Sequence, residues 1–149
     1  MVRFYLETSA LAKRYILEEG TSRILELIET SECLITSRLT LVEVASAAVR
    51  RAKAGDISGE ELLGLLHTLE DEFRTRFDVI ELGGATITRS IDLIRVHALR
   101  AADGIQLACA LIAASESATN REFLFVSADV ELNAAAEKEG LTVLDPQTK

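Results

Sequence analysis

Short apolar runs alternate with longer amphipathic stretches along the whole sequence, and this alternation limits the fold more than any other feature. The runs predict strands at residues 3–7, 33–37, 78–82, 123–127 and 141–144. The stretches between them predict helices at residues 9–17, 21–30, 38–55, 58–76, 84–98, 103–115 and 129–139. Strands that alternate with helices indicate an α/β domain with a mostly parallel sheet. The runs are continuously apolar, which is typical of strands covered on both faces.

The size and composition of the chain predict one globular domain. Its 149 residues fit a single domain, 1–149, with four to five strands flanked by helices. Hydrophobic residues make up 48% of the chain and it has one proline, which indicates an ordered protein. The sequence has no long apolar run and no signal peptide, and Cys33 and Cys109 have neither disulfide-scaffold nor zinc-site spacing. We therefore expect a cytoplasmic protein without a membrane segment.

Four carboxylates occupy positions where an acid is unexpected. Glu7 and Asp129 each follow a predicted strand at the start of a helix, so both should lie at the carboxyl edge of the parallel sheet. Glu43, in "LTLVEVASAAV", and Asp103, in "LRAADGIQLACAL", lie in apolar helical stretches. A buried ionised carboxylate is costly unless it is paired or binds a metal. These four acids are therefore candidates for one functional site.

The two acids on helices also have a purely structural interpretation. Glu43 could belong to a polar stripe with Ser46 and Arg50, although that stripe is thin. Asp103 could be the N-cap of a helix that begins at the next residue, because aspartate is a favoured N-cap. Asp103 could also pair with Arg100. Considered alone, the segment around Asp103 favours the structural interpretation.

The two acids at strand ends differ in how well structure alone explains them. Asp129 could cap the helix that follows it, and Ser127 could be a turn residue. Glu7 is harder to explain, because Thr8 and Ser9 are better N-caps than glutamate. The helix dipole favours an acid at this position by only about 0.3–1 kcal/mol.

Considered together, the four acids predict a divalent cation. Four carboxylates brought together without an equal set of cations would repel one another strongly. Ligands that are all oxygen atoms favour Mg²⁺ or Mn²⁺, and the sequence has no His–Cys cluster for zinc. His67 and His97 lie on predicted helices remote from the acids, where we expect partly exposed side chains. The net charge of −8 disfavours a broad nucleic-acid surface, but a metal site built from carboxylates can still attract phosphate.

At this point the sequence resembles a known family. The order of "YLETSALAKRY", "LTLVEVASA", "LRAADGIQLACAL" and "FVSADVELNAAAEKEGLTVLDP" is similar to PIN-domain proteins of the VapC type, the toxins of type II toxin–antitoxin pairs. The resemblance spans essentially the whole chain. It implies a parallel sheet with an acidic pocket at the carboxyl ends of its strands. It also implies an endoribonuclease, a hydrolase that cleaves RNA with Mg²⁺ or Mn²⁺.

The resemblance assigns the site residues one by one. By resemblance the four acidic positions of the family fall, in order, on Glu7, Glu43, Asp103 and Asp129. Ser9 and Ser127 match the hydroxyl positions beside the first and fourth acids, and Arg100 matches a basic residue before the third. Two departures stand out: the first acid is usually Asp but here is Glu7, and the position occupied by Gln106 is often His.

The resulting hypothesis for catalysis divides the acids by role. Glu7, Asp103 and Asp129 would hold one Mg²⁺ or Mn²⁺, while Glu43 would orient the attacking water, complete a second metal site, or both. Ser127 would hydrogen-bond a metal ligand or a water. Basic side chains, namely Arg100 with Lys13 or Arg14, could position the RNA backbone.

The resemblance also implies partners, and two other functions compete with the ribonuclease. A VapC-type toxin would pair with an antitoxin that covers the acidic pocket and would form a homodimer. Helix 58–76 and the small-residue face of 103–114 could be association surfaces or core. One competing hypothesis is a catalytically impaired PIN-like protein, with Glu7 at the first acidic position, that binds RNA or a protein without efficient cleavage. The other is a phosphoryl-accepting α/β domain, which would usually place a Lys beside the last strands, where none is found.

Overall fold

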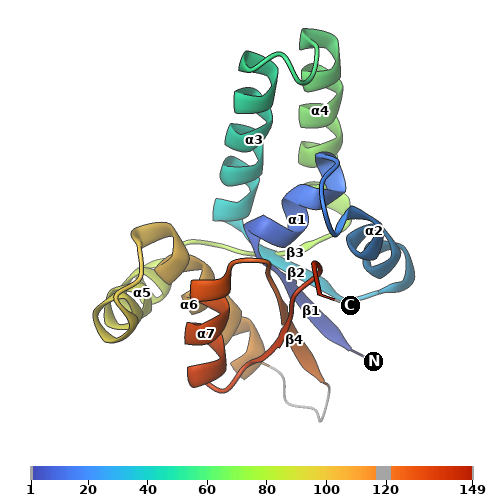
Figure 1. Cartoon of the computed structure of the whole chain (residues 1–149). Helices are drawn as coiled ribbons and strands as arrows, with labels where there is room; N and C mark the ends of the chain where they lie inside the picture. The colour runs from blue at the N-terminus through green and yellow to red at the C-terminus, as the bar shows by residue number, and fades with distance from the viewer. Residues whose placement is uncertain (1, 117–121, 149) are drawn as a thin grey trace.

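Five parallel strands form one sheet at the centre of the protein. A computed structural model describes residues 2–116 and 122–148 (Figure 1). The strands are β1 (Arg3–Leu6), β2 (Leu34–Ser37), β3 (Asp78–Ile80), β4 (Phe123–Val126) and β5 (Thr142–Leu144). Their order in the sheet is β3-β2-β1-β4-β5, and every neighbouring pair is parallel. The predicted α/β class and mostly parallel sheet are confirmed.

The strand β1 lies in the middle of the sheet and fixes its register. Phe4 lies opposite Leu34 of β2 on one side and Leu124 of β4 on the other. Because the first strand is central, the residues that follow β1, β2 and β4 leave the sheet side by side at its carboxyl edge. This is the edge where Glu7 and Asp129 were predicted to lie.

Seven helices surround the sheet within the described ranges. They are α1 (Thr8–Tyr15), α2 (Thr21–Thr30), α3 (Arg38–Lys53), α4 (Gly59–Thr75), α5 (Gly84–His97), α6 (Ala101–Ser115) and α7 (Val130–Lys138). All the predicted elements are present, with ends that differ by a few residues. The helix α6 begins at Ala101 with Arg100 as its N-cap, two residues earlier than predicted.

Two hydrophobic cores lie on opposite faces of the sheet, because successive side chains of a strand point to opposite faces. Tyr5 and Phe125 stack at 5.7 Å between ring centroids and pack with residues of α5, α6 and α7. Leu6 and Val126 pack on the other face with residues of α1, α2, α3 and α4. The small-residue face of α6 is buried in the first core, so it is not an association surface.

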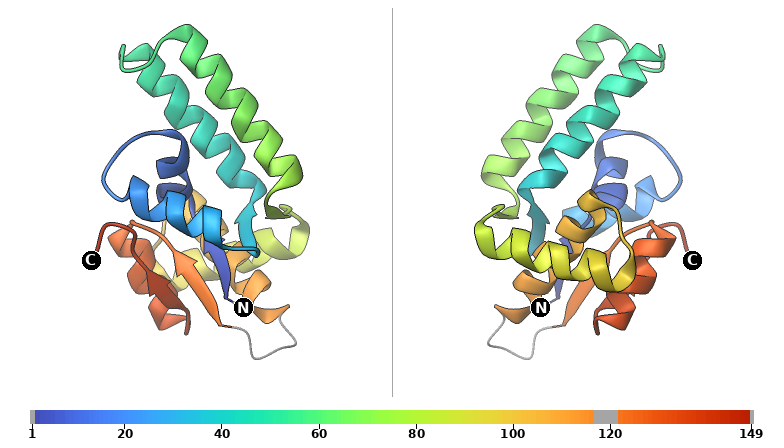
Figure 2. Two further views of the ribbon diagram at one scale, coloured as in Figure 1. Left: turned by 90° about the vertical axis from the view of Figure 1, so that its right-hand side faces the viewer. Right: turned by 90° about the vertical axis from the view of Figure 1, so that its left-hand side faces the viewer.

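The helices α3 and α4 form a long antiparallel hairpin that projects beyond the sheet (Figures 1 and 2). The start of α4 is fixed by a capping box, in which Ser58 and Glu61 satisfy each other's backbone N–H groups. The turn before α2 uses Gly20 at φ +92°, a conformation that other residues rarely adopt. Because α3 begins directly after β2, its first turns lie above the carboxyl edge of the sheet.

No single helix in the described ranges is long and apolar enough to cross a membrane. The pair α5 and α6 passes by combined length and composition, but the two helices are bent by 116° at their break. The residues of α6 belong largely to the core of the domain.

Candidate active site

Glu7 is a buried carboxylate at the junction between β1 and α1. It is the N-cap of α1, and its side chain is 4% exposed. Its Oε2 accepts a hydrogen bond from the Ser9 backbone N–H at 2.9 Å and another from the Ser9 hydroxyl. Burial raises the pKa of Glu7 to about 7, and the charge of Asp129 adds to this, whereas the hydrogen bonds from Ser9 and Ser127 oppose it. Glu7 is therefore held in place but is costly to ionise without a nearby positive charge.

Hydroxyl groups connect Glu7 to the loop between β4 and α7. The Ser9 hydroxyl oxygen accepts the Ala128 N–H at 2.8 Å and lies 3.4 Å from the Ser127 hydroxyl. The Ser127 hydroxyl accepts the Asp129 N–H at 3.1 Å. The Asp129 carboxylate in turn accepts the Leu132 N–H at 3.0 Å. This chain of hydrogen bonds ties the first and fourth acids to one another across the sheet edge.

Glu43 is positioned by a second network that joins α1, α3 and α6. Its Oε1 accepts hydrogen bonds from the Thr8 hydroxyl at 2.6 Å and from the Gln106 amide at 2.9 Å. The Gln106 amide nitrogen also donates a hydrogen bond to the Thr40 hydroxyl at 2.9 Å. The Gln106 side-chain carbonyl oxygen accepts a hydrogen bond from the Tyr5 hydroxyl at 2.8 Å. Gln106 is 1% exposed, so the centre of this network is buried, whereas Thr8 and Glu43 are half-buried.

Asp103 lies in the first turn of α6 and is half-buried. Burial raises its pKa, and the negative charges of Asp129 and Glu43 raise it further, whereas Arg100 lowers it. The guanidinium of Arg100 is exposed and forms no ion pair within the described ranges. These charge effects show that Asp103 interacts electrostatically with Asp129 and Glu43.

The structural interpretations of the acids have mixed outcomes. Asp129 does cap α7, as the local sequence allowed. Asp103 is not an N-cap, because α6 begins earlier at Ala101. Glu7 is the N-cap of α1, so the expectation that Thr8 or Ser9 would be preferred there was wrong.

The polar stripe suggested for Glu43 does not form in the predicted way. Arg50 donates to the Ser46 hydroxyl at 2.7 Å, whereas Glu43 bonds to α1 and α6. Glu43 therefore belongs to the site at the sheet edge.

Two basic side chains that were expected near RNA form ion pairs within the protein. Lys13 is 3% exposed and pairs with Glu18 at 3.2 Å. Arg14 pairs with Glu72 at 3.0 Å. The suggestion that Lys13 or Arg14 could contact the RNA backbone stays a prediction; Lys13 is buried, whereas the Arg14 side chain is 31% exposed. Arg100 stays exposed beside Asp103.

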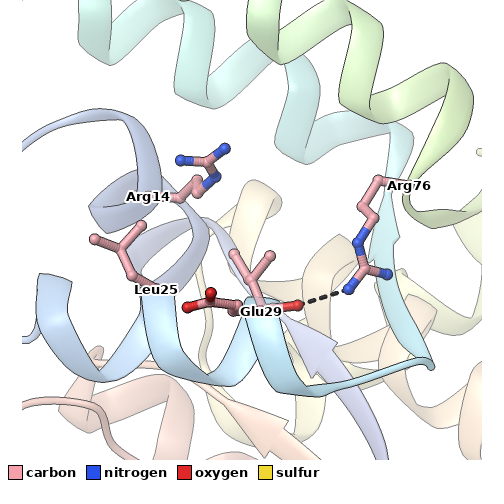
Figure 3. Close-up of a pocket in the computed structure, with 5 residues that line it drawn as sticks. Arg14, Leu25, Glu29 and Arg76 are labelled. Atoms are coloured by element: carbon pink, nitrogen blue, oxygen red, sulfur yellow. Dashed lines mark hydrogen bonds between the residues drawn. The ribbon is translucent and has the colours of Figure 1, made fainter.

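A hollow of about 420 Å³ lies away from the four acids, between α1, α2 and the end of α4 (Figure 3). Arg14, Leu25, Ile28, Glu29 and Arg76 line it. The Arg76 guanidinium donates to the backbone carbonyls of Ile28 and Ser31, both at 2.6 Å. Arg76 thus satisfies backbone groups where α2 ends, which gives it a structural role.

The donor chemistry of the site fits a hard divalent cation, since it consists of carboxylate and hydroxyl oxygen atoms. Within residues 2–116 and 122–148, however, no three His, Cys, Asp or Glu side chains are grouped closely enough to hold a metal ion by themselves. A bound ion would therefore need water molecules to complete its shell, which Mg²⁺ commonly retains.

Several residues at the site were not predicted. Thr8 and Thr40 hold the network around Glu43, and Asn133 donates to the Ser127 carbonyl at 2.8 Å. Gln106 was noted only as a departure from a family pattern, yet it connects four side chains. The one available signal was an amide in an otherwise apolar helix, three residues after Asp103.

Comparison with known proteins now identifies the class of domain. The model of the PIN domain family matches residues 4–138, a range that contains all four acids. The chain therefore belongs to the PIN-domain family. Ribonuclease VapC45 of Mycobacterium tuberculosis (strain CDC 1551 / Oshkosh) is 33% identical over 107 residues, which cover 72% of this chain and 74% of that protein. This likeness places the chain among the VapC toxins of the family.

Solved structures support the same fold. FitAcB from Neisseria gonorrhoeae superimposes with a TM-score of 0.71 at 15% identity, covering 98% of this chain and 99% of that one. A toxin–antitoxin complex from Klebsiella pneumoniae gives a TM-score of 0.63 at 17% identity, covering 95% of this chain and 96% of that one.

Proposed function

We propose that this protein is a divalent-metal-dependent endoribonuclease that acts as the toxin of a toxin–antitoxin pair in the cytoplasm. The observation that supports the proposal is the electrostatic coupling of Asp129 to Glu7 and Asp103. Glu7 and Asp103 have raised pKa values, and the charge of Asp129 contributes to both. The likeness to a protein named ribonuclease VapC45 supports RNA as the substrate.

Glu7, Asp103 and Asp129 are the residues that would hold Mg²⁺ or Mn²⁺. A bound divalent ion supplies electrostatic stabilisation for charge on the scissile phosphate and the leaving oxygen. Ser9 orients the Glu7 carboxylate. Ser127 holds the backbone N–H of Asp129, whereas the Leu132 N–H holds the Asp129 carboxylate. A cation at this place would also relieve the cost of ionising Glu7 in its buried position.

Glu43 would orient the attacking water or contribute to a second metal site. Both of its hydrogen bonds reach Oε1, so its Oε2 has no partner within the described ranges and can accept a bond from water. Gln106 and Thr8 fix the side chain, so little conformational entropy is lost when the substrate binds. Arg100 would contact the RNA backbone near Asp103.

The likeness to a solved complex supports a protein partner for this chain. The Klebsiella pneumoniae structure is a toxin–antitoxin complex. We propose that an antitoxin protein binds this chain too and covers the acidic edge. We also propose that the chain forms a homodimer.

RNA cleavage by an Asp103→Asn variant tests the proposal. The substitution removes a charge but keeps the shape of the side chain. We expect the cleavage rate with Mn²⁺ to fall by more than the roughly 10- to 100-fold that loss of an outer-shell partner costs. Calorimetric titration with Mn²⁺ should show weaker binding. An Asp71→Asn variant is the matched control, because Asp71 is exposed on α4 and pairs with Arg74. Full activity of Asp103→Asn would refute the metal-site assignment.

A further inference from the structure

Arg50 is an exposed arginine on α3 that forms no ion pair within residues 2–116 and 122–148. Of the five exposed arginines that the structure describes, Arg74 and Arg89 form ion pairs, whereas Arg50, Arg95 and Arg100 form none. Ion pairs to carboxylates hold Arg14, Arg38, Arg51, Arg74 and Arg89. Arg50 instead makes a hydrogen bond to a neutral partner, the Ser46 hydroxyl, at 2.7 Å. Its positive charge is therefore available to a ligand.

The helical repeat places Arg50 on the same face of α3 as Glu43. The two residues are seven positions apart, which is two turns of an α-helix. Their side chains therefore differ in direction by only about 20° and are about 10 Å apart along the helix axis. The residues between them on this face are Ser46 and Ala47, and both are small. Because Cα–Cβ bonds tilt toward the N-terminus of a helix, the Arg50 side chain leans back toward the acids. The bond to Ser46, one turn earlier, holds it in that direction.

A strand of RNA needs a positive group beyond the acidic edge. The net charge of −8 repels a polyanion, and the acids themselves add to this repulsion. Lys13 is buried and pairs with Glu18, and Arg14 pairs with Glu72. Arg100 is the N-cap of α6, whereas Arg50 lies on α3, so these two arginines belong to different elements of the fold.

We propose that Arg50, held by Ser46, is a phosphate-binding subsite on α3 for an RNA phosphate near, but not at, the bond that is cleaved. This inference rests on the proposed ribonuclease function. It implies that the RNA runs along α3, the helix of the hairpin that begins at the sheet edge (Figure 1). A phosphate contact carries no sequence information, so Arg50 sets affinity for all RNA sequences alike.

The test uses binding and cleavage of a labelled, mixed-sequence single-stranded RNA. Binding is measured by fluorescence anisotropy in an Asp103→Asn background, so that the RNA stays intact. Adding Arg50→Ala should raise Kd about three- to tenfold and lower the slope of log Kd against log salt by about 0.7. In the active protein, Arg50→Ala should raise KM by a similar factor and leave kcat unchanged. Arg50→Lys should keep most of the affinity.

Arg51→Ala is the matched control. It removes the same charge from the next position, about 100° around α3, where Arg51 pairs with Glu18 and Asp56 at 3.6 and 3.8 Å. If Arg50→Ala and Arg51→Ala give the same Kd and KM, the subsite is refuted while the ribonuclease function stands. If the unaltered protein cleaves no RNA but Arg50→Ala alone weakens RNA binding, the proposed activity is refuted and the subsite stands.

Discussion

Glu7 illustrates at the scale of one residue how a functional acid affects stability. Its carboxyl group has a pKa of about 7 in the folded protein, against 4.5 for the unperturbed group. Between these pH values the folded state binds the proton more tightly than the unfolded state does. The stabilising contribution is therefore complete below pH 4.5 and is lost as pH rises through 7.

This linkage gives the first prediction, for the metal-free protein. The free energy of unfolding should fall by about 3 kcal/mol between pH 4.5 and pH 7 because of Glu7. Urea denaturation in a chelating buffer measures it. Glu7→Gln should remove most of this decline, leaving the smaller part that comes from Asp103, whose pKa is also raised. Glu29→Gln, an exposed site on α2, should leave the decline unchanged. A flat stability profile for the unaltered protein would contradict the burial of an unpaired acid.

The length of the Glu7 side chain gives the second prediction. Ser9 draws the Glu7 carboxylate back over the start of α1, and aspartate is itself a favoured N-cap. We therefore expect the RNA cleavage rate of Glu7→Asp to be close to that of the unaltered protein. The difference should be far smaller than the roughly 10²-fold that a misplacement of 1 Å can cost. A gain near that size, in a variant that melts like the unaltered protein, would mean that this chain is a catalytically impaired PIN protein that binds without efficient cleavage.

Gln106 controls the site at the scale of elements, because it joins β1, α1, α3 and α6. Gln106→Leu would leave the Tyr5 hydroxyl without its acceptor and Glu43 without one donor, in a buried position. We expect the free energy of unfolding to fall by about 2–4 kcal/mol and the cleavage rate to fall with it. Urea denaturation and a cleavage assay measure the two effects.

The chain offers a matched control for this third prediction. Gln147 is the other glutamine and is exposed, so Gln147→Leu should change neither quantity. Gln106→His keeps a nitrogen donor in place and should recover part of the cleavage rate. Equal stability of Gln106→Leu and Gln147→Leu would show that the buried network is not important for folding.

The elements were predictable from the sequence, whereas the networks between them were not. Periodicity alone locates every helix and strand, and the rule for parallel sheets places Glu7 and Asp129 at one edge. The partners of Glu43 come from residues 35 and 63 positions away, at Thr8 and Gln106. Which side chains meet there depends on the rotational phase of three helices. Local sequence does not specify that phase, so the role of Gln106 could not be derived.

At the scale of the whole molecule, α5 is the element with the clearest exposed apolar surface. Ile87 and Ile91 lie one turn apart on one side of α5 and are 41% and 61% exposed. An exposed patch of this kind marks an interaction site more often than isolated apolar residues do. In a homodimer with two-fold symmetry, the same patch would be buried on both chains.

The fourth prediction follows from this surface. We expect sedimentation to show that the purified protein is a dimer at micromolar concentration. Ile91→Lys should make it monomeric, because the substitution occurs on both chains and places two charges in a two-fold interface. Leu17→Lys is the control: Leu17 is 85% exposed but lies in the turn between α1 and α2, away from α5. A monomeric unaltered protein would refute the homodimer. If Ile91→Lys is still a dimer, the interface lies on another surface. The next candidate is the surface of α3 that carries the exposed Val42 and Val49.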